Sequence, residues 1–350
     1  MGTDNRPLYA TLAALPKIEL HRHLEGTLRL ATLVDIARQY QLPMPAYDVE
    51  GLRPYVQITA QSPHTIEHFL SKFDLLRRFY CSPEVIKRVA REAVEDAAAD
   101  NIRYMEMRFT PKALAHLMGY PFTDVIHWVA EAVREAQQGR SIRVNLIASI
   151  NRHESVTEAE HVLSAVLECR DPSVVAFDLA GQEEGLTNEP FYEVFSEAHK
   201  QGLNVTVHAG EWAGAKNVYD AIVHMQAARI GHGVRIVEDS VVAKLAREHN
   251  SIFEVCLTSN EQSGVIDRVN HHPLRDMRAL GLRTTINTDD PAVSDITLTH
   301  ELYVAMTALG LSLDEVKQQI LDAAASAFLP PIERDSLIAE LKASLYSTVK

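Results

Sequence analysis

The sequence predicts a (β/α)8 barrel of the TIM type, with extra helices over the mouth of the barrel. Eight short strand-like runs recur along the 350 residues, helical patterns separate nearly all of them, and unusual polar residues gather where several runs end. Such alternation is typical of a closed parallel barrel, whose functional residues lie at the carboxyl ends of the strands. Since no linker, repeat or low-complexity block divides residues 1–350, we expect one domain.

The first strand-like run lies between Pro16 and Gly26, where apolar and polar residues alternate. His21 and His23 are two residues apart, so in a strand they face the same side, close to the turn at Gly26. Neutral imidazole is a common zinc ligand. Alone, however, a pair of this kind is more often solvated or hydrogen-bonded, so the later segments decide its meaning.

A long helical tract follows the first strand. Residues 30–41 carry a helical stripe that ends before Pro43 and Pro45, and a second stripe runs from Ser62-Pro63 through Ile66. Ser82 with Pro83 begins a third helix as N-cap and first residue. The tract is too long for one crossover helix, so we expect part of it to cover the barrel mouth. Phe69 and Phe73, one helical turn apart, are lid candidates, with plain core packing as the alternative.

Seven further runs have the composition of strands, with helices such as residues 190–201 and 241–250 between them. Residues 312–350 read as helices interrupted at Pro330 and Pro331. The seven runs are residues 102–109, 143–150, 174–181, 204–210, 229–234, 251–257 and 283–290.

Composition excludes several classes of protein. A net charge of −13 argues against binding to a nucleic-acid backbone, which relies on clustered Lys and Arg. The start of the chain lacks a signal-peptide pattern and no apolar run is long enough to span a bilayer, so we expect a cytoplasmic protein with a small-molecule partner. Cys81, Cys169 and Cys256 are widely spaced, which indicates free thiols in packing roles.

Polar residues that suit catalysis stand at the ends of four predicted strands. Each alone has an ordinary explanation, such as a buried histidine, a helix N-terminal acid or a turn. Their joint placement at one rim has no such explanation. Three imidazoles with one carboxylate suit zinc and leave room for a water. These residues are His21, His23, His208, Glu211, His232, Asp289 and Asp290.

The chemistry expected of this group is hydrolysis. A divalent metal lowers the pKa of bound water and so supplies a hydroxide. Glu211 is the candidate acid or base, because desolvation beside a metal ligand raises a carboxyl pKa. His232 can hold the hydroxide, Asp290 can accept a hydrogen bond from a substrate N–H, and Gly181 offers a backbone N–H that a flat ligand can approach.

Five segments of the sequence resemble, in order, the signatures of the adenosine/adenine deaminase family of metal-dependent hydrolases, and they cover the chain from about residue 16 to 330. A single H-x-H would be unspecific, but five matching motifs are highly specific. The segments are Pro16 to Gly26, Asp178 to Gly181, His208 to Glu211, Arg229 to Gly233 and Asn287 to Pro291.

The resemblance implies a role for each matched residue. It implies that Glu211 protonates N1 of a purine and that His232 assists the attack of a zinc-activated water at C6, which releases ammonia. It further implies that Gly181 contacts N3, that Asp290 contacts N7 and that Glu25, with His23, lies near the ribose. The ligands implied for one zinc ion are His21, His23, His208 and Asp289.

The choice of substrate depends on departures from the family pattern. Glu25 stands where adenosine-specific members usually have Asp, and Gln182 replaces a common Asp, whereas Gly231 resembles the nucleoside branch. We therefore expect deamination of adenosine or deoxyadenosine, with free adenine or a 5′-modified adenosine such as aminodeoxyfutalosine as alternatives.

Two other protein classes fit the sequence less well. A non-catalytic purine-binding protein would lack a metal ligand or the acid Glu211, whereas this sequence contains all four metal ligands and Glu211. The zinc deaminases that flip nucleic-acid bases carry a C-x-x-C pair, which this sequence lacks.

Overall fold

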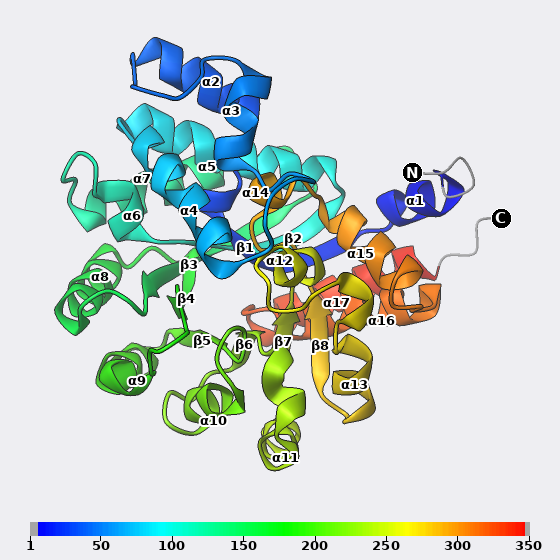
Figure 1. Cartoon of the computed structure of the whole chain (residues 1–350). Coiled ribbons are helices and arrows are strands. Elements are labelled where there is room, and N and C mark those ends of the chain that lie inside the picture. Colours follow the sequence, from blue (N-terminus) through cyan, green and yellow to red (C-terminus); the bar gives the residue numbers. More distant parts are fainter. Residues whose placement is uncertain (1–5, 347–350) are drawn as a thin grey trace.

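The computed structural model describes residues 6–346 and contains a (β/α)8 barrel, as the sequence predicts. Eight parallel strands lie side by side in sequence order, with helices around them (Figure 1). The strands are β1 Lys17–His23, β2 Ile102–Phe109, β3 Arg143–Asn151, β4 Val174–Ala180, β5 Asn204–Ala209, β6 Arg229–His232, β7 Ile252–Val255 and β8 Arg283–Ile286.

The barrel closes between β8 and β1 through residues that follow β8. The backbone N–H of Asp289 donates to His21 O at 2.9 Å, and the N–H of His23 donates to Asp289 O at 2.9 Å. Nearer the start of β1, the side-chain oxygen of Asn287 accepts from the Leu20 N–H at 2.9 Å. Closure therefore fixes Asp289 directly beside the two histidines of β1.

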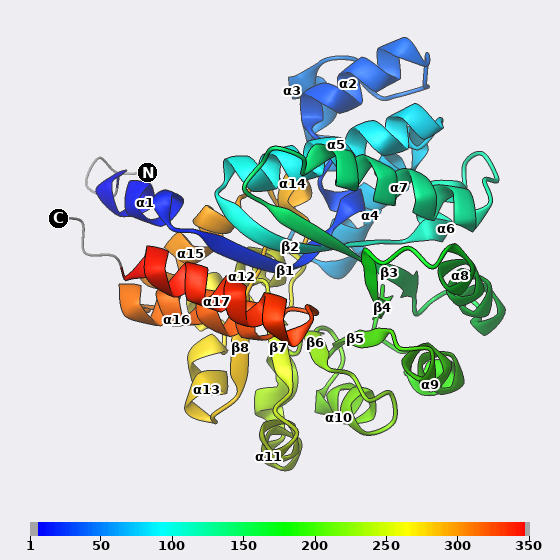
Figure 2. The ribbon, with the colours of Figure 1, turned by 180° about the vertical axis from the view of Figure 1, so that it is seen from behind.

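Most helices follow the strands and cover the outside of the barrel. Figure 2 shows α16 and α17 side by side, and α16 also packs along β8 and β1. The α-helices are α1 Arg6–Ala14, α2 Leu30–Gln39, α3 Val49–Val56, α4 Ile66–Leu76, α5 Pro83–Ala99, α6 Pro111–Ala115, α7 Phe122–Ala136, α8 Val156–Cys169, α9 Tyr192–Lys200, α10 Ala215–Val223, α11 Ser240–Glu248, α12 Leu257–Gln262, α13 Leu274–Ala279, α14 Pro291–Ser294, α15 Leu298–Thr307, α16 Leu313–Ala325 and α17 Pro331–Leu345.

The predicted start of the third helix at Ser82 and Pro83 is confirmed. Ser82 Oγ caps α5 by accepting from the Val85 N–H, and Pro83 occupies the first helical position. The helix α4 begins at Ile66, later than the predicted start at Ser62-Pro63, because Thr65 is its N-cap and the Thr65 hydroxyl accepts from the His68 N–H.

Several predicted boundaries and omissions need correction. The last two strands are shorter than predicted, because Cys256 and Leu257 turn into α12 and the chain leaves β8 at Ile286. The helices α1, α3, α14 and α15 had no prediction. Gly51 and Pro54 weaken the helical pattern of α3, which forms on packing against α2 and α4.

Both faces of the first strand are buried. The sequence alternation at Ile18 and Leu20 predicts a strand, yet Lys17, Glu19 and His21 are also fully buried. A parallel strand in a barrel has helices on one side and the barrel interior on the other, so neither face meets water. Within residues 6–346, no helix is long and apolar enough to cross a membrane.

Candidate active site

The predicted site residues come together at the carboxyl ends of four strands. His21 and His23 end β1, His208 lies near the end of β5 with Glu211 in the following loop, and His232 ends β6. His232 and Asp289 have left-handed backbones, with φ of 57° and 66°. Such conformations cost about 1–3 kcal/mol each in residues other than glycine and cluster at functional sites.

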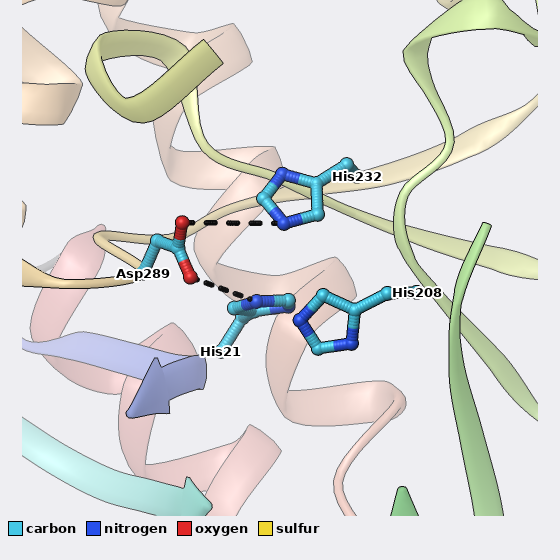
Figure 3. A group of neighbouring side chains, drawn as sticks. All are labelled: His21, His208, His232 and Asp289. Carbon is cyan, nitrogen blue, oxygen red and sulfur yellow. Dashed lines mark ion pairs between the residues drawn. The ribbon is translucent and has the colours of Figure 1, made fainter. Parts of the chain in front are cut away.

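The imidazoles surround the carboxylate of Asp289. One ligand atom from each of His21, His208, His232 and Asp289 lies within 4.8 Å of the others, and all four residues are buried (Figure 3). His21 Nε2 is 3.2 Å from Asp289 Oδ1, and His232 Nε2 is 4.0 Å from Oδ2. This nitrogen and oxygen donor set suits a divalent transition metal.

The group of four in the structure differs from the predicted metal ligands at one histidine. His23 is predicted as a ligand, whereas the group contains His232 in its place. His23 nevertheless faces the same centre, with its Nε2 at 3.2 Å from His208 Nε2 and 3.4 Å from Asp289 Oδ1. Four imidazoles therefore surround one carboxylate, and a four-coordinate site would use three of them.

The Nδ1 atoms of His21 and His208, on the far side of each ring, face buried carboxylates. His21 Nδ1 lies 2.8 Å from Glu254 Oε2, and His208 Nδ1 lies 3.4 Å from Asp178 Oδ1. A carboxylate at Nδ1 favours a proton there and leaves the Nε2 lone pair free to bind a metal. The ring orientation of both histidines therefore fits a metal centre.

Two buried arginines hold these carboxylates. Arg108 donates to Glu254 at 2.7 Å and lies 3.6 Å from Asp178, and Arg229 donates to Glu254 at 2.5 Å and to Glu106 at 2.5 Å. Although burial opposes ionisation of Glu254, the two guanidinium groups hold its pKa well below the usual range. Glu254 is therefore a fixed negative charge behind His21.

Glu211 lies next to His232, with Glu211 Oε2 3.6 Å from His232 Nε2. Burial, followed by the negative charges of Asp289 and Glu183, raises the pKa of Glu211 well above that of an ordinary carboxyl. Burial also holds the pKa of His232 well below its usual range. Burial therefore favours the protonated form of Glu211 and the neutral form of His232, and these two forms are a proton donor beside a proton acceptor.

One cavity joins the metal-binding group to the predicted substrate contacts. Phe69 and Phe73 of α4, the lid candidates, form part of its wall, so this helix does reach the barrel mouth. The lining residues are His23, Glu25, Phe69, Leu70, Phe73, Arg77, Thr110, Asn151, Ala180, Gly181, His208, Glu211, Trp212, His232, Asp289 and Asp290.

Gly181 has a positive φ of 79°, and a Cβ there would lie 3.0 Å from the Cβ of Asn151. Both the backbone conformation and the close neighbour therefore require glycine at this wall of the cavity.

The carboxyl of Asp290, which the sequence analysis expects to accept a hydrogen bond from the substrate, lines the same cavity. Burial and the charges of Asp289 and Glu25 raise the pKa of Asp290 well above its usual value. Its Oδ1 is buried and has no hydrogen-bond partner within residues 6–346. A protonated carboxyl donates, so Asp290 suits a ring nitrogen that carries a lone pair.

Residue patterns alone gave no role to Glu183, Asp178, Arg108 or Glu254. For two of them a signal exists in the sequence, because a charged side chain within a strand that is otherwise apolar must be paired when the sheet is parallel and buried. Asp178 and Glu254 are the only charged residues of β4 and β7, whereas Arg108 shares β2 with Arg103 and Glu106 and is itself fully buried. Glu183 lies in a loop, where a charged residue carries no comparable signal.

Comparisons with known proteins agree on one family. A family model described as adenosine deaminase matches residues 16–344. The chain is 37% identical over 326 residues to an adenosine deaminase of Klebsiella pneumoniae (strain 342), covering 93% of this chain and 97% of that one.

Solved structures give the same picture. A zinc-bound amidohydrolase from Burkholderia ambifaria superposes with a TM-score of 0.88 at 26% identity, covering 96% of this chain and 92% of that one. The N6-methyl-AMP deaminase of Arabidopsis thaliana superposes with a TM-score of 0.84 at 26% identity, covering 96% and 98%.

Replacing Glu254 with Gln tests the role of the carboxylate behind His21. We expect the affinity for a divalent metal to fall about 10–100-fold, because the substitution removes the charge that orients and polarises the imidazole. Competition with a chromophoric chelator measures this affinity. Glu248→Gln, at an exposed position on α11, is the control, and equal affinities in the two variants would contradict the role of Glu254.

Proposed function

The chain belongs to the adenosine deaminase family, and on that premise we propose that it removes the 6-amino group of adenosine or deoxyadenosine by hydrolysis. The products are inosine or deoxyinosine and ammonia. One observation supports the proposal most strongly: a buried carboxyl with a raised pKa, Glu211, lies 3.6 Å from a neutral imidazole at the edge of the His and Asp group. Addition of water to a purine ring requires a proton donor and a proton acceptor in this arrangement.

The donor set fits one zinc ion per chain. The residues that would hold it are His21, His23, His208 and Asp289, whose outer partners Glu254 and Asp178 leave the Nε2 lone pairs of His21 and His208 available. When bound, zinc lowers the pKa of a coordinated water so that it attacks at neutral pH.

Three groups position the purine ring. Glu211 faces N1, the backbone N–H of Gly181 donates to N3, and the protonated carboxyl of Asp290 donates to N7. These are three ring nitrogens with lone pairs, so the assignment needs a protonated Glu211 and a protonated Asp290. Burial and neighbouring negative charges favour that state at both carboxyls.

Proton transfers then balance the reaction. Glu211 donates its proton to N1, while His232 Nε2 accepts a proton from the water that attacks C6. The C6–N bond breaks, and the 6-amino group leaves as ammonia with the proton that His232 received. The second proton of the water returns to Glu211, which restores the acid.

An ultraviolet assay tests the proposed reaction. The purified protein should convert adenosine and deoxyadenosine to their 6-oxo products, because the site presents an acid, a base and a metal-binding group at one cavity. Dialysis against a chelator should abolish turnover and added zinc should restore it. No turnover of any 6-aminopurine by the zinc-loaded protein would contradict the proposal.

The variant Glu211→Gln tests the acid. We expect kcat to fall about 10²–10⁴-fold, since Gln cannot donate a proton to N1. Bound zinc should stay at one ion per chain, because Glu211 is not among the proposed ligands. Unchanged turnover, with metal content measured on the same sample, would remove Glu211 from this role.

A second candidate substrate is a 6-aminopurine nucleoside with an anionic group on its 5′ carbon. Arg77 lines the cavity, and its Nε is buried without a hydrogen-bond partner among the residues the structure describes. Glu25 directs one oxygen to the Thr110 N–H at 2.7 Å, while its other oxygen has no partner within residues 6–346. A guanidinium with an unused donor at the wall shared with Glu25 suits an anionic oxygen.

The variant Arg77→Gln distinguishes the two candidates. If Arg77 binds a 5′ anion, kcat/KM for adenosine 5′-monophosphate should fall about tenfold or more relative to that for adenosine, as expected for loss of a hydrogen bond to a charged group. The control is Arg78→Gln, at the exposed neighbouring position. An unchanged ratio of the two kcat/KM values in Arg77→Gln would exclude this role.

The variant Glu25→Asp tests the contact with the ribose separately. If Glu25 lies at the ribose, the ratio of adenosine to adenine turnover should change.

A further inference from the structure

Glu183 receives an unusual number of hydrogen bonds from one loop. Its Oε2 accepts from the backbone N–H groups of Glu211, Trp212 and Ala213 at 2.9, 3.0 and 3.0 Å. Its Oε1 accepts from the Gly210 N–H at 2.7 Å and from Asn217 Nδ2 at 2.9 Å. Four consecutive peptide groups therefore converge on one carboxylate.

This carboxylate is buried and no cation of the described residues is in ion-pair contact with it. Glu183 is 1% exposed, and within residues 6–346 no ion pair to it is found within 4.0 Å. A buried charge is tolerated only when hydrogen bonds or an opposite charge compensate it. Here the aligned N–H dipoles of the loop do so, in the way that a backbone nest binds an anion.

The loop held in this way carries the proposed acid. It connects β5 to α10 and begins at Gly210, whose φ of 71° and whose close approach to Val218 both require glycine. Glu211 follows directly, three residues after the proposed ligand His208. The conformation of residues 210–213 therefore sets where the Glu211 carboxyl lies relative to the purine.

A purely structural role of Glu183 would be to attach the loop after β4 to the segment from β5 to α10, but other contacts already attach this loop to β5 and α10. Asn188 Nδ2 donates to Asn217 O at 3.0 Å, Arg152 donates to Asn188 Oδ1 at 3.1 Å, and Arg152 also donates to His208 O at 2.5 Å. What Glu183 adds is a contact to the N–H groups of Glu211 and of the two residues after it. No other side chain of the described residues accepts a hydrogen bond from these three groups.

We infer that Glu183 is a positioning residue, which fixes the acid Glu211 against the substrate ring by binding the peptide groups around it. The inference rests on the proposed function, because Glu211 acts as the acid only in that reaction. A displacement of about 1 Å in a catalytic group costs up to about 100-fold in rate. Loss of these hydrogen bonds should therefore lower kcat more than it raises KM.

The test uses Glu183→Gln and Glu183→Asp in the zinc-loaded full-length chain. Gln turns an NH2 group toward N–H donors and must lose at least two acceptor contacts, while Asp keeps the charge but is one methylene shorter. The matched control is Glu184→Gln, at the exposed next residue. The measurements are kcat and KM for adenosine, bound zinc, and hydrogen–deuterium exchange of the peptide that covers residues 209–214.

For Glu183→Gln we expect kcat about 10–100-fold lower, KM within about threefold of wild type, full zinc content and faster exchange at residues 210–213. Glu183→Asp should keep more of the activity. In the background of Glu211→Gln, the second change Glu183→Gln should add little, because both act through the same group.

Three results would overturn the inference. These are wild-type kcat in Glu183→Gln, zinc loss that accounts for the whole decrease, or full additivity with Glu211→Gln. If the wild type and Glu184→Gln are both inactive on all 6-aminopurines, the proposed function fails instead, and the exchange of residues 210–213 then decides whether Glu183 fixes the loop.

Discussion

The site depends on a buried network of charged side chains that contacts the Nδ1 side of the proposed histidine ligands. Arg108 contacts both Glu254, behind His21, and Asp178, behind His208. One guanidinium group therefore links the outer partners of two proposed ligands that come from opposite parts of the barrel. Because the barrel also closes through Asp289, the ligands are set by the backbone and by buried ion pairs before any ion binds.

This interior departs from that of an ordinary barrel. Layers of Val, Ile and Leu usually fill the space between the strands. Here Glu106, Arg108, Asp178, Arg229 and Glu254 occupy it, each 1% exposed or less. Buried ion pairs add little net stability compared with apolar packing, whereas removal of one partner costs about 3–5 kcal/mol. We therefore interpret the network as orienting the imidazoles and not as a source of stability.

Most of the fold and of the site was predictable because both depend on local patterns. Strand composition and chain order are enough to place His21, His208 and Asp289 at one rim, since carboxyl ends of parallel strands meet there. The network beneath them depends on side-chain partners far apart in sequence, such as Arg108 and Glu254, which no local pattern pairs. The direction of the pKa shift at Asp290 could not be predicted from the sequence for a related reason, because it depends on the burial and charge of residues that only the fold brings close.

The most direct test of this account is a crystal structure of the zinc-loaded protein, with the ion located by anomalous scattering. We expect one ion bound by the Nε2 atoms of His21, His23 and His208 at about 2.0–2.1 Å and by the carboxylate of Asp289 at about 2.0–2.2 Å. His232 should lie outside bonding distance and face the water site beside Glu211. An ion bound by His232 in place of His23, or bound away from Asp289, would contradict the account.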